Sequence, residues 1–369
     1  MTTSRTSLLR PLGLIAAAAL ACAQALAAPP EAASPPLTPT QRHEVLQTLA
    51  RKLSANYVFP DVAAQINGAL PARVEAYGPA VTAAEFARLI SRDLRALGHD
   101  KHFRVFHDPE FREEVDGADA VPSAEQIEHQ RDEVTQLGYG IEKLQRLPGN
   151  VAYLELRGFG PPDLVAPGYA AAMRLVDGSD ALILDLRRNG GGAPGAVAQL
   201  LSYFFALGDE RHLNDIYTRS SGQTQQFWTS AVAAPRYRKP VYVLISARTF
   251  SGGEECAYDF QTQKRATLVG QTTGGGANAG DRFSLGQGLV INIPTARAIN
   301  PITKTNWEGV GVKPDIEVPA AQAQQTAYVA ILKTLAAQSR DPRDARQLKE
   351  LLAMAEKGEG PQPVYEMRQ

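Results

Sequence analysis

The first third of the chain has hydrophobic positions at helical spacing. Thr38 followed by Pro39 is typical of a helix start, and a second helix is expected from Asp61, after Pro60. The clearest helix starts with the capping-box pattern Thr82-x-x-Glu85 and ends at Gly98. Its apolar stripe consists of Phe86, Leu89, Ile90, Leu94 and Leu97. These patterns predict an N-terminal helical-bundle domain over residues 40–107.

Beyond residue 148, short apolar runs alternate with helical patterns. Five runs resemble buried strands: residues 151–156, 181–186, 241–245, 267–269 and 289–293. Helical patterns, such as residues 195–205 and 253–263, lie between them. The alternation predicts an α/β core over residues 149–320, followed by C-terminal helices within residues 321–369. Residues 108–148 are polar and weakly patterned, so we expect a connector there.

The N-terminus is interpreted as an export signal. Arg5 and Arg10 precede an apolar run that is too short to span a bilayer comfortably. Residues 25–27 then have the small-x-small pattern that a signal peptidase accepts. We therefore expect a signal peptide over residues 1–27 and a Pro-rich linker over residues 28–39, in an exported protein that is periplasmic or secreted.

Composition narrows the classes of function. The chain has 369 residues, and its 44% hydrophobic residues exclude a mostly disordered chain. Its formal net charge of −1 gives no electrostatic reason to expect nucleic acid as a partner. Two cysteines exclude a disulfide scaffold and a cysteine-built zinc site. Acylation of Cys22 in a lipoprotein is an alternative to cleavage after residue 27. Cleavage would leave Cys256 without an intramolecular partner.

Ser251 is the first candidate for chemistry. It follows the apolar run 241–245 in a tight Ser-Gly-Gly turn, and a helix is predicted immediately after it. A hydroxyl there lies beside free backbone N–H groups and the positive end of a helix dipole. Those groups could stabilise the oxyanion formed when Ser251 attacks a carbonyl. A plain helix N-cap is the alternative, because Ser is common at that position.

A second turn carries three consecutive glycines after the strand that ends at Asp185. Glycines at a strand exit allow close backbone approach and present N–H groups outward. A phosphate-binding loop is disfavoured, because the chain has no Gly-Lys-Ser/Thr and no GxGxxG pattern. We expect Gly191 or Gly192 to supply an oxyanion donor that pairs with the N–H of Gly252. A purely structural turn is the alternative.

A serine nucleophile needs a base, and three histidines follow the third helix: His99, His102 and His107. A metal site is the competing interpretation, but surface loops with incidental histidines are commoner, so neither a metal nor another cofactor is predicted. Spacing alone does not choose among the three. Glu308, in a Gly-rich stretch after the strands, could orient a histidine or could be a solvated surface group.

Four motifs together resemble the serine peptidase superfamily of the C-terminal processing proteases and the tricorn core. They are residues 185–192 (DLRRNGGG), 251–255 (SGGEE), 270–276 (GQTTGGG) and 311–315 (GVKPD). The likeness covers most of residues 40–320. It is nearest to the modules of interphotoreceptor retinoid-binding protein and their bacterial relatives. The resemblance implies a crotonase/ClpP-like ββα core, with Ser251 at the position of the nucleophile.

The resemblance also implies partners for Ser251. Processing proteases use a Ser–Lys dyad, but residues 274–277, in the glycine-rich motif that would carry the lysine, read Gly-Gly-Gly-Ala. The tricorn-like Ser, His and Glu correspond to Ser251, His102 and Glu308. His102 is selected because residues 100–102 match the Asp-x-His segment of the family.

Two hypotheses follow. The first is an exported serine peptidase that acts on peptides or unfolded proteins, in which Ser251 attacks, His102 accepts its proton and Glu308 holds the imidazole. The second is a non-catalytic binding module for a hydrophobic small molecule or peptide, because the retinoid-binding modules share these motifs. No nucleic-acid partner is expected, and residues 107–150 leave no room for the PDZ domain of the processing proteases. The oligomeric state is not predicted.

Overall fold

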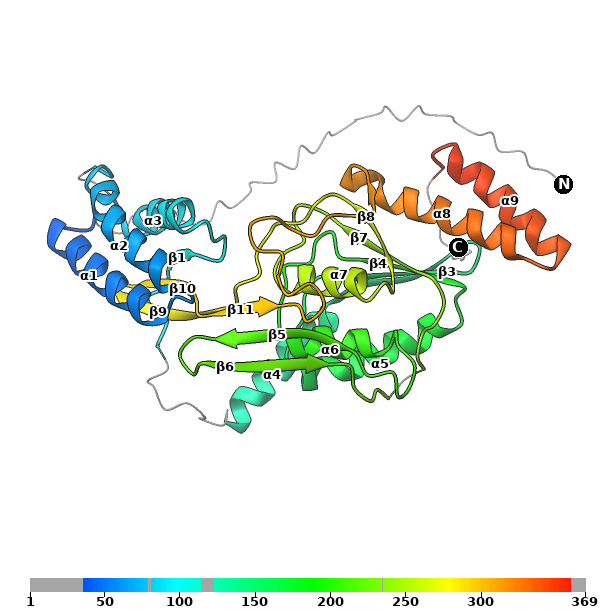
Figure 1. Cartoon of the computed structure of the whole chain (residues 1–369), viewed down its shortest axis with the longest axis horizontal. Coiled ribbons are helices and arrows are strands. Elements are labelled where there is room, and N and C mark those ends of the chain that lie inside the picture. Colours follow the sequence, from blue (N-terminus) through cyan, green and yellow to red (C-terminus); the bar gives the residue numbers. More distant parts are fainter. Residues whose placement is uncertain (1–35, 79–80, 114–122, 234, 360–369) are drawn as a thin grey trace, which may run out of the picture. The chain divides into compact units, whose positions relative to one another are not determined.

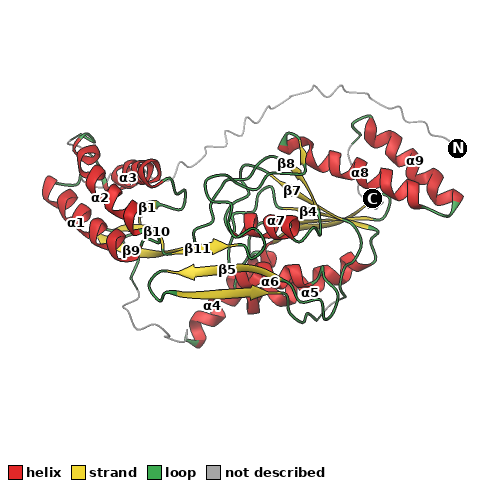
Figure 2. Cartoon of the chain, viewed as in Figure 1, coloured by secondary structure: helices red, strands yellow, loops and turns green. Residues whose placement is uncertain are grey.

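The computed structural model describes residues 36–78, 81–113, 123–233 and 235–359. Within them, a helical N-terminal part accompanies a central mixed sheet, so the predicted α/β class with N-terminal helices is confirmed (Figures 1 and 2). The predicted signal peptide, residues 1–27, and the alternative acylation site at Cys22 lie outside the described residues. None of the described helices combines the length and apolar character that a membrane span requires.

The N-terminal part contains α1 (Pro39–Asn56), α2 (Pro60–Glu75) and α3 (Ala83–Gly98). The capping box expected at the start of α3 is present, because Thr82 and Glu85 each accept the other's backbone N–H. The helix ends at Gly98, and the following His99 adopts a left-handed conformation with φ of 52°. Local capping signals therefore determined the ends of α3, as predicted.

The helices pack against a small antiparallel sheet in the order β1-β10-β9. Its strands are β1 (Arg104–His107), β9 (Gly280–Gly286) and β10 (Leu289–Pro294). The sequence pattern suggests that β10 is a strand of the α/β core. Instead, Leu289, Ile291 and Ile293 share a hydrophobic cluster with the three helices. These residues are two positions apart, so they lie on one face of the strand. Either helices or another sheet can bury such a face, so the pattern alone does not show which of them covers it.

The central sheet has the strand order β12-β8-β7-β4-β3-β2, with β2 antiparallel to β3 and all other neighbours parallel. Its strands are β2 (Ile141–Leu147), β3 (Val151–Leu156), β4 (Ala181–Asp185), β7 (Val241–Ile245), β8 (Thr267–Gly270) and β12 (Ile316–Glu317). In parallel strands buried on both faces, most positions are apolar, which is why β3, β4 and β7 were predictable.

Residues 108–148, expected to be a connector, contain regular structure. They include α4 (Ala124–Gln136), the 3₁₀ turn η1 (Gly138–Gly140) and β2, which is an edge strand of the central sheet. No residue of α4 is buried, and only Leu147 is buried in β2. Elements that bury so little surface have weak hydrophobic periodicity, so the pattern did not reveal them.

Helices cover both faces of the central sheet. α5 (Pro162–Asp177), α6 (Pro194–Ser202) and α7 (Gly252–Thr262) share one hydrophobic cluster with alternate strand residues such as Leu182 and Leu184. The intervening residues, such as Ile183, pack with α8 (Ala323–Gln338), and α9 (Pro342–Glu356) joins them. The short 3₁₀ turn η2 (Ala320–Gln322) precedes α8. The result is a three-layer arrangement.

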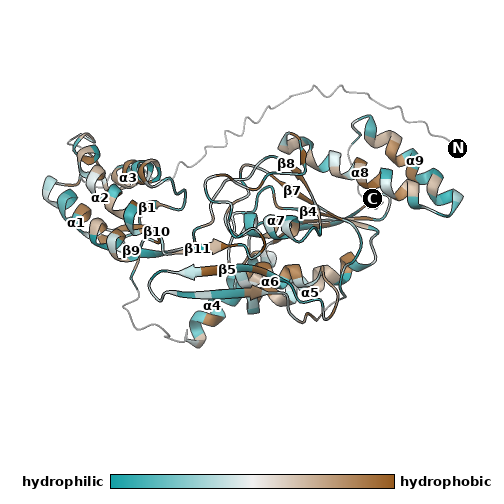
Figure 3. Cartoon of the chain, viewed as in Figure 1, coloured by the Kyte–Doolittle hydropathy of each residue, from teal (hydrophilic) through white to brown (hydrophobic). Residues whose placement is uncertain are grey.

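A third sheet has the order β11-β5-β6, with β5 (His212–Thr218), β6 (Gln223–Trp228) and β11 (Ala296–Ile299). β6 is polar and mostly exposed, and Figure 3 colours it as hydrophilic. The sequence pattern did not predict β6 as a strand because its side chains are exposed on both faces.

Because Ile291 is fully buried between the small sheet and the helices, Ile291→Ala should lower the free energy of unfolding by about 2–5 kcal/mol. Urea denaturation measures this loss. The control Ile302→Ala, at a side chain that is 53% exposed, should cost less than about 1 kcal/mol. Equal losses in the two variants would contradict the packing of β10 against the helices.

Candidate active site

Ser251 lies at the junction between the loop that follows β7 and the start of α7. It is the N-cap residue of α7, which is the position that the sequence offered as the alternative to a nucleophile. Its backbone has φ of 53° and ψ of −123°, a conformation that residues other than glycine rarely adopt. Such strain persists only where surrounding contacts impose it, and it is frequent at functional sites.

The glycine turn after β4 packs directly against Ser251. A Cβ placed on Gly191 would lie 2.7 Å from the Ser251 Cβ and 2.9 Å from the Gly252 nitrogen. A Cβ on Gly252 would lie 2.9 Å from the Gly192 oxygen and 3.0 Å from its nitrogen. Gly191 and Gly192 also have φ of 105° and 137°. Glycine is therefore required here both by its backbone angles and by close approach.

The three predicted oxyanion donors differ in their hydrogen bonds. The Gly191 N–H donates to Asn189 Oδ1 at 2.8 Å, so it is already engaged. Among the described residues, neither the Gly192 N–H nor the Gly252 N–H donates a hydrogen bond. The arrangement therefore leaves Gly192 and Gly252, rather than Gly191, with N–H groups available beside Ser251.

Glu254 joins the Ser251 turn to the glycine-rich loop that follows β8. Its fully buried carboxylate accepts the Ser251 N–H at 2.9 Å, the Gly275 N–H at 2.6 Å, the Gly276 N–H at 2.9 Å and the Thr273 hydroxyl. Burial raises the pKa of Glu254, and these four hydrogen bonds oppose that shift. One side chain thus fixes two loops that are distant in sequence.

His102 reaches the same region from the end of the helical part. Its ring packs against the ring of Phe250, the residue before Ser251, with centroids 4.7 Å apart. A Cβ on Gly276 would lie 2.7 Å from the His102 Cε1 atom. Both imidazole nitrogens are shielded from solvent and have no hydrogen-bond partner among the described residues. The structure thus brings His102 close to the Ser251 turn without a Ser251–His102 hydrogen bond.

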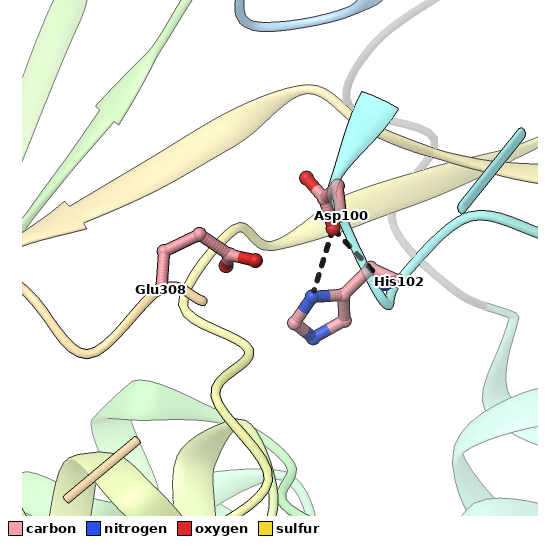
Figure 4. Close-up of side chains that lie close together, drawn as sticks. All are labelled: Asp100, His102 and Glu308. Atoms are coloured by element: carbon pink, nitrogen blue, oxygen red, sulfur yellow. Dashed lines mark hydrogen bonds and ion pairs between the residues drawn. The ribbon is translucent and has the colours of Figure 1, made fainter. Parts of the chain in front are cut away.

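Two carboxyl groups flank the imidazole (Figure 4). Asp100 Oδ1 lies 3.6 Å from His102 Nδ1 and accepts the His102 backbone N–H at 3.0 Å. The other Asp100 oxygen accepts the Asn278 amide at 2.9 Å and faces the Tyr57 hydroxyl at 3.4 Å. Ligand atoms of Asp100, His102 and Glu308 lie within 4.8 Å of one another.

Glu308 differs from Asp100 in its partners. One of its oxygens accepts the Ala277 N–H at 2.5 Å, while the other is buried and has no hydrogen-bond partner among the described residues. Burial, and next the nearby charge of Asp100, raise the pKa of Glu308 to about 7. Glu308 can therefore change charge near neutral pH, directly beside the imidazole.

The three histidines of the sequence cluster do not meet. His99 and His107 are exposed, and neither belongs to the Asp100–His102–Glu308 group. Within the described residues this group alone has the spacing of a candidate metal site. Of the three histidines, only His102 belongs to this group.

Two family comparisons cover most of the described chain. Residues 150–318 match peptidase family S41, and residues 36–139 match the N-terminal domain of Peptidase_S41 in eukaryotic IRBP. The chain belongs to peptidase family S41.

Two similar proteins are named as processing enzymes. Carboxyl-terminal-processing peptidase 1, chloroplastic, of Arabidopsis thaliana is 28% identical over 193 residues, which are 51% of this chain and 38% of that protein. The carboxyl-terminal-processing protease of Synechocystis is 30% identical over 169 residues, 46% of this chain and 38% of that protein. The matches thus span less than two fifths of the length of these relatives.

One solved structure has a similar fold. A candidate peptidase from Parabacteroides merdae superposes with a TM-score of 0.50 and 17% sequence identity, over 75% of this chain and 89% of that one. At that identity the likeness concerns the fold alone.

Sequence reasoning missed two of the residues that hold this S41 site together. Glu254 lies in the SGGEE motif, and Ser251-x-x-Glu254 is itself a capping-box pattern that signals the contact between the two residues. Asp100 was used only to select His102. Its contacts with Tyr57 and Asn278 join distant parts of the chain, and no local signal predicts them.

Replacement of Glu254 should destabilise the protein. Glu254→Ala leaves four buried donors without an acceptor, so the free energy of unfolding should fall by about 3–5 kcal/mol. Glu254→Gln should recover only part of this, because its NH₂ group would face a donor. Urea denaturation is the measurement. Glu317→Ala, at an exposed acid, is the control, and an equal effect there would contradict the role of Glu254.

Proposed function

We propose that this chain is a serine peptidase in which Ser251 is the nucleophile and His102 the general base. The observation that carries the proposal is the strained Ser251 turn, with the available N–H groups of Gly192 and Gly252 beside it and His102 packed on Phe250. A residue that served only to cap α7 would need neither the second glycine turn nor a shielded imidazole nearby.

The proposed reaction has two stages. Ser251 Oγ attacks the carbonyl carbon of a peptide bond while His102 accepts the hydroxyl proton. The N–H groups of Gly192 and Gly252 stabilise the oxyanion, and these donors cost no reorganisation because the backbone already holds them. The C–N bond then breaks, and His102 returns the proton to the leaving amine. Water hydrolyses the acyl-enzyme in the same way.

Ser251 and His102 are not hydrogen-bonded in the protein without substrate. The proposed reaction therefore includes a small movement of these side chains that brings the Ser251 hydroxyl and the His102 imidazole into hydrogen-bond contact. Catalytic hydrogen bonds are often long in free enzymes and shorten when substrate binds. Packing of the His102 ring on Phe250 limits the imidazole to small movements.

Glu308 and Asp100 have different roles in the proposed site. Asp100 accepts the His102 backbone N–H and is held by Asn278, so it positions the segment that carries the base. Glu308 has a buried oxygen without a partner, and in its charged form it would stabilise the imidazolium formed during attack. The Ser251–His102–Glu308 set expected from the family resemblance is therefore retained, with Asp100 added.

Peptides or unfolded proteins are the proposed substrates, since the related proteins are named for processing carboxyl termini. Export to the periplasm or the exterior remains part of the proposal because of the N-terminal pattern of residues 1–27. Binding of a hydrophobic molecule or peptide without catalysis is the competing function. It is supported by the match of residues 36–139 to the IRBP-type N-terminal domain.

Covalent labelling separates the two functions. The protein should react with a fluorophosphonate probe at Ser251, and Ser251→Ala should abolish the label, whereas Ser220→Ala, at an exposed serine, should not. His102→Ala should slow labelling by about 100-fold or more, compared with the control His129→Ala. Intact-mass spectrometry follows the reaction. An unlabelled native protein, or equal labelling of Ser251→Ala, would rule out the serine peptidase.

The role of Glu308 predicts a pH dependence. With a pKa of about 7, Glu308 is mostly protonated at about pH 6 and mostly charged at about pH 8. Glu308→Gln should therefore lower the labelling rate by about 100-fold at the higher pH, where the lost charge stabilised the imidazolium, and by much less at the lower pH. The measured quantity is the ratio of native to variant rate across pH. A ratio that does not change with pH would contradict this role.

A further inference from the structure

A cavity of about 490 Å³ opens beside the glycine turn that contacts Ser251. Its lining is largely apolar: it includes Val134, Leu137, Tyr139, Phe159 and Val165, and Gly191 also contributes to it. The volume falls in the range of small-molecule and side-chain binding sites. Leu137 is 66% exposed, so it leaves a large apolar surface in water at this cavity.

Gly191 connects the cavity to the nucleophile. The same residue that lines the cavity has its backbone against the Ser251 Cβ and the Gly252 nitrogen. The Phe159 N–H donates to the Gly191 carbonyl at 2.9 Å, and the Ala193 N–H donates to the Phe159 carbonyl at 2.8 Å. The wall that contains Phe159 is thus fixed to the turn that carries the proposed oxyanion donors.

Another part of the lining, at residues 138–140, is held in an unusual backbone conformation. Gly138, Tyr139 and Gly140 have consecutive φ values of 59°, 60° and 80°. Tyr139 packs against Gly168 of α5, where a Cβ would lie 2.4 Å from the Tyr139 Cβ. Glycine adopts such angles freely, but the tyrosine between the two glycines needs support from its surroundings. The tyrosine is therefore held in place as part of the wall.

The charged residues of the lining are paired with each other. Arg157 lies 3.7 Å from Glu142 and 2.8 Å from Glu155. A charged ligand group would have to replace these pairs, whereas an apolar group needs only to displace water from Val134, Leu137 and Phe159. The cavity therefore favours an apolar occupant.

We infer that this cavity binds the side chain of the residue whose carbonyl is attacked, so that substrates carry an apolar residue on the N-terminal side of the cleaved bond. The inference rests on the proposed function. In a bound peptide, the Cα of that residue lies about 2.4 Å from the carbonyl oxygen held by Gly192 and Gly252. Its side chain consequently starts close to Gly191, which lines the cavity.

Diphenyl phosphonate probes test this directly, because they differ only in the side chain next to phosphorus. Ser251 Oγ forms a bond to phosphorus, the phosphorus–phenoxy bond breaks, and phenol leaves with the serine proton. The native protein should react with probes bearing a Leu or Phe side chain at least about 10-fold faster than with Lys or Asp probes. Released phenol and intact mass give the rates.

Two variants assign the preference to this cavity. Val134→Trp fills the space, so its rate with the Phe probe should fall about 10-fold or more relative to its rate with the Ala probe. The Ala probe also reports whether this variant is folded. Leu137→Glu, at an exposed position, should reduce the preference for Phe over Lys. The matched control Leu175→Glu, 62% exposed and outside the cavity, should behave as the native protein.

The outcomes separate the two proposals. A native protein that reacts with a simple fluorophosphonate at Ser251 but shows no apolar preference overturns the cavity assignment and leaves the peptidase intact. An apolar preference that both Val134→Trp and Leu137→Glu retain also overturns the assignment. A native protein that reacts with no probe overturns the proposed function and the cavity assignment with it.

Discussion

The site depends on one buried carboxylate, that of Glu254. Its two oxygens accept four hydrogen bonds from the Ser251 turn and the glycine-rich loop at residues 273–276. A buried carboxylate is stable only where hydrogen-bond donors satisfy its oxygens. The buried donors in turn need these oxygens as acceptors. The strained φ of Ser251 and the position of Gly276 beside His102 thus depend on the same contact.

The base reaches this centre through a second set of contacts between distant segments. Asp100 and His102 follow α3, and several partners of this segment come from residues 274–292. Asn278 donates to Asp100, Asn292 donates to the His102 carbonyl, and Lys101 donates to the Gly274 carbonyl. The segment with the base is therefore held by residues 274–292 as well as by α3, whose Arg95 donates to the Phe103 carbonyl.

Residues with a local cause were predictable from sequence. The capping box of α3, the buried runs of β3, β4 and β7, and the glycine turn against Ser251 each follow from neighbours in the chain. Elements with little buried surface, α4, β2 and β6, left too weak a pattern. In the site, the sequence spacing was enough to select Ser251 and the glycines. It did not distinguish His102 from His99 and His107, which required the family resemblance and then the positions of the side chains. The orientation of β10 depends on contacts with helices that are far away in sequence, and the hydrogen bond from the Gly191 N–H to Asn189 is local but has no recognisable sequence signal.

The pairing of β1 with β10 has a consequence for the order of folding. Val105 pairs with Ile291, so the core of the N-terminal helices includes side chains made long after the helices themselves. During synthesis the three helices emerge first with an incomplete core. Pairing of β1 with β10 then closes the long loop between them, and the contacts of β10 must offset the entropy that this closure costs. The helical part therefore lacks a share of its core until β10 has been made. The loop with His102 acquires its fixed place only when the chain has been made past residue 294, so assembly of the site is delayed until most of the chain exists.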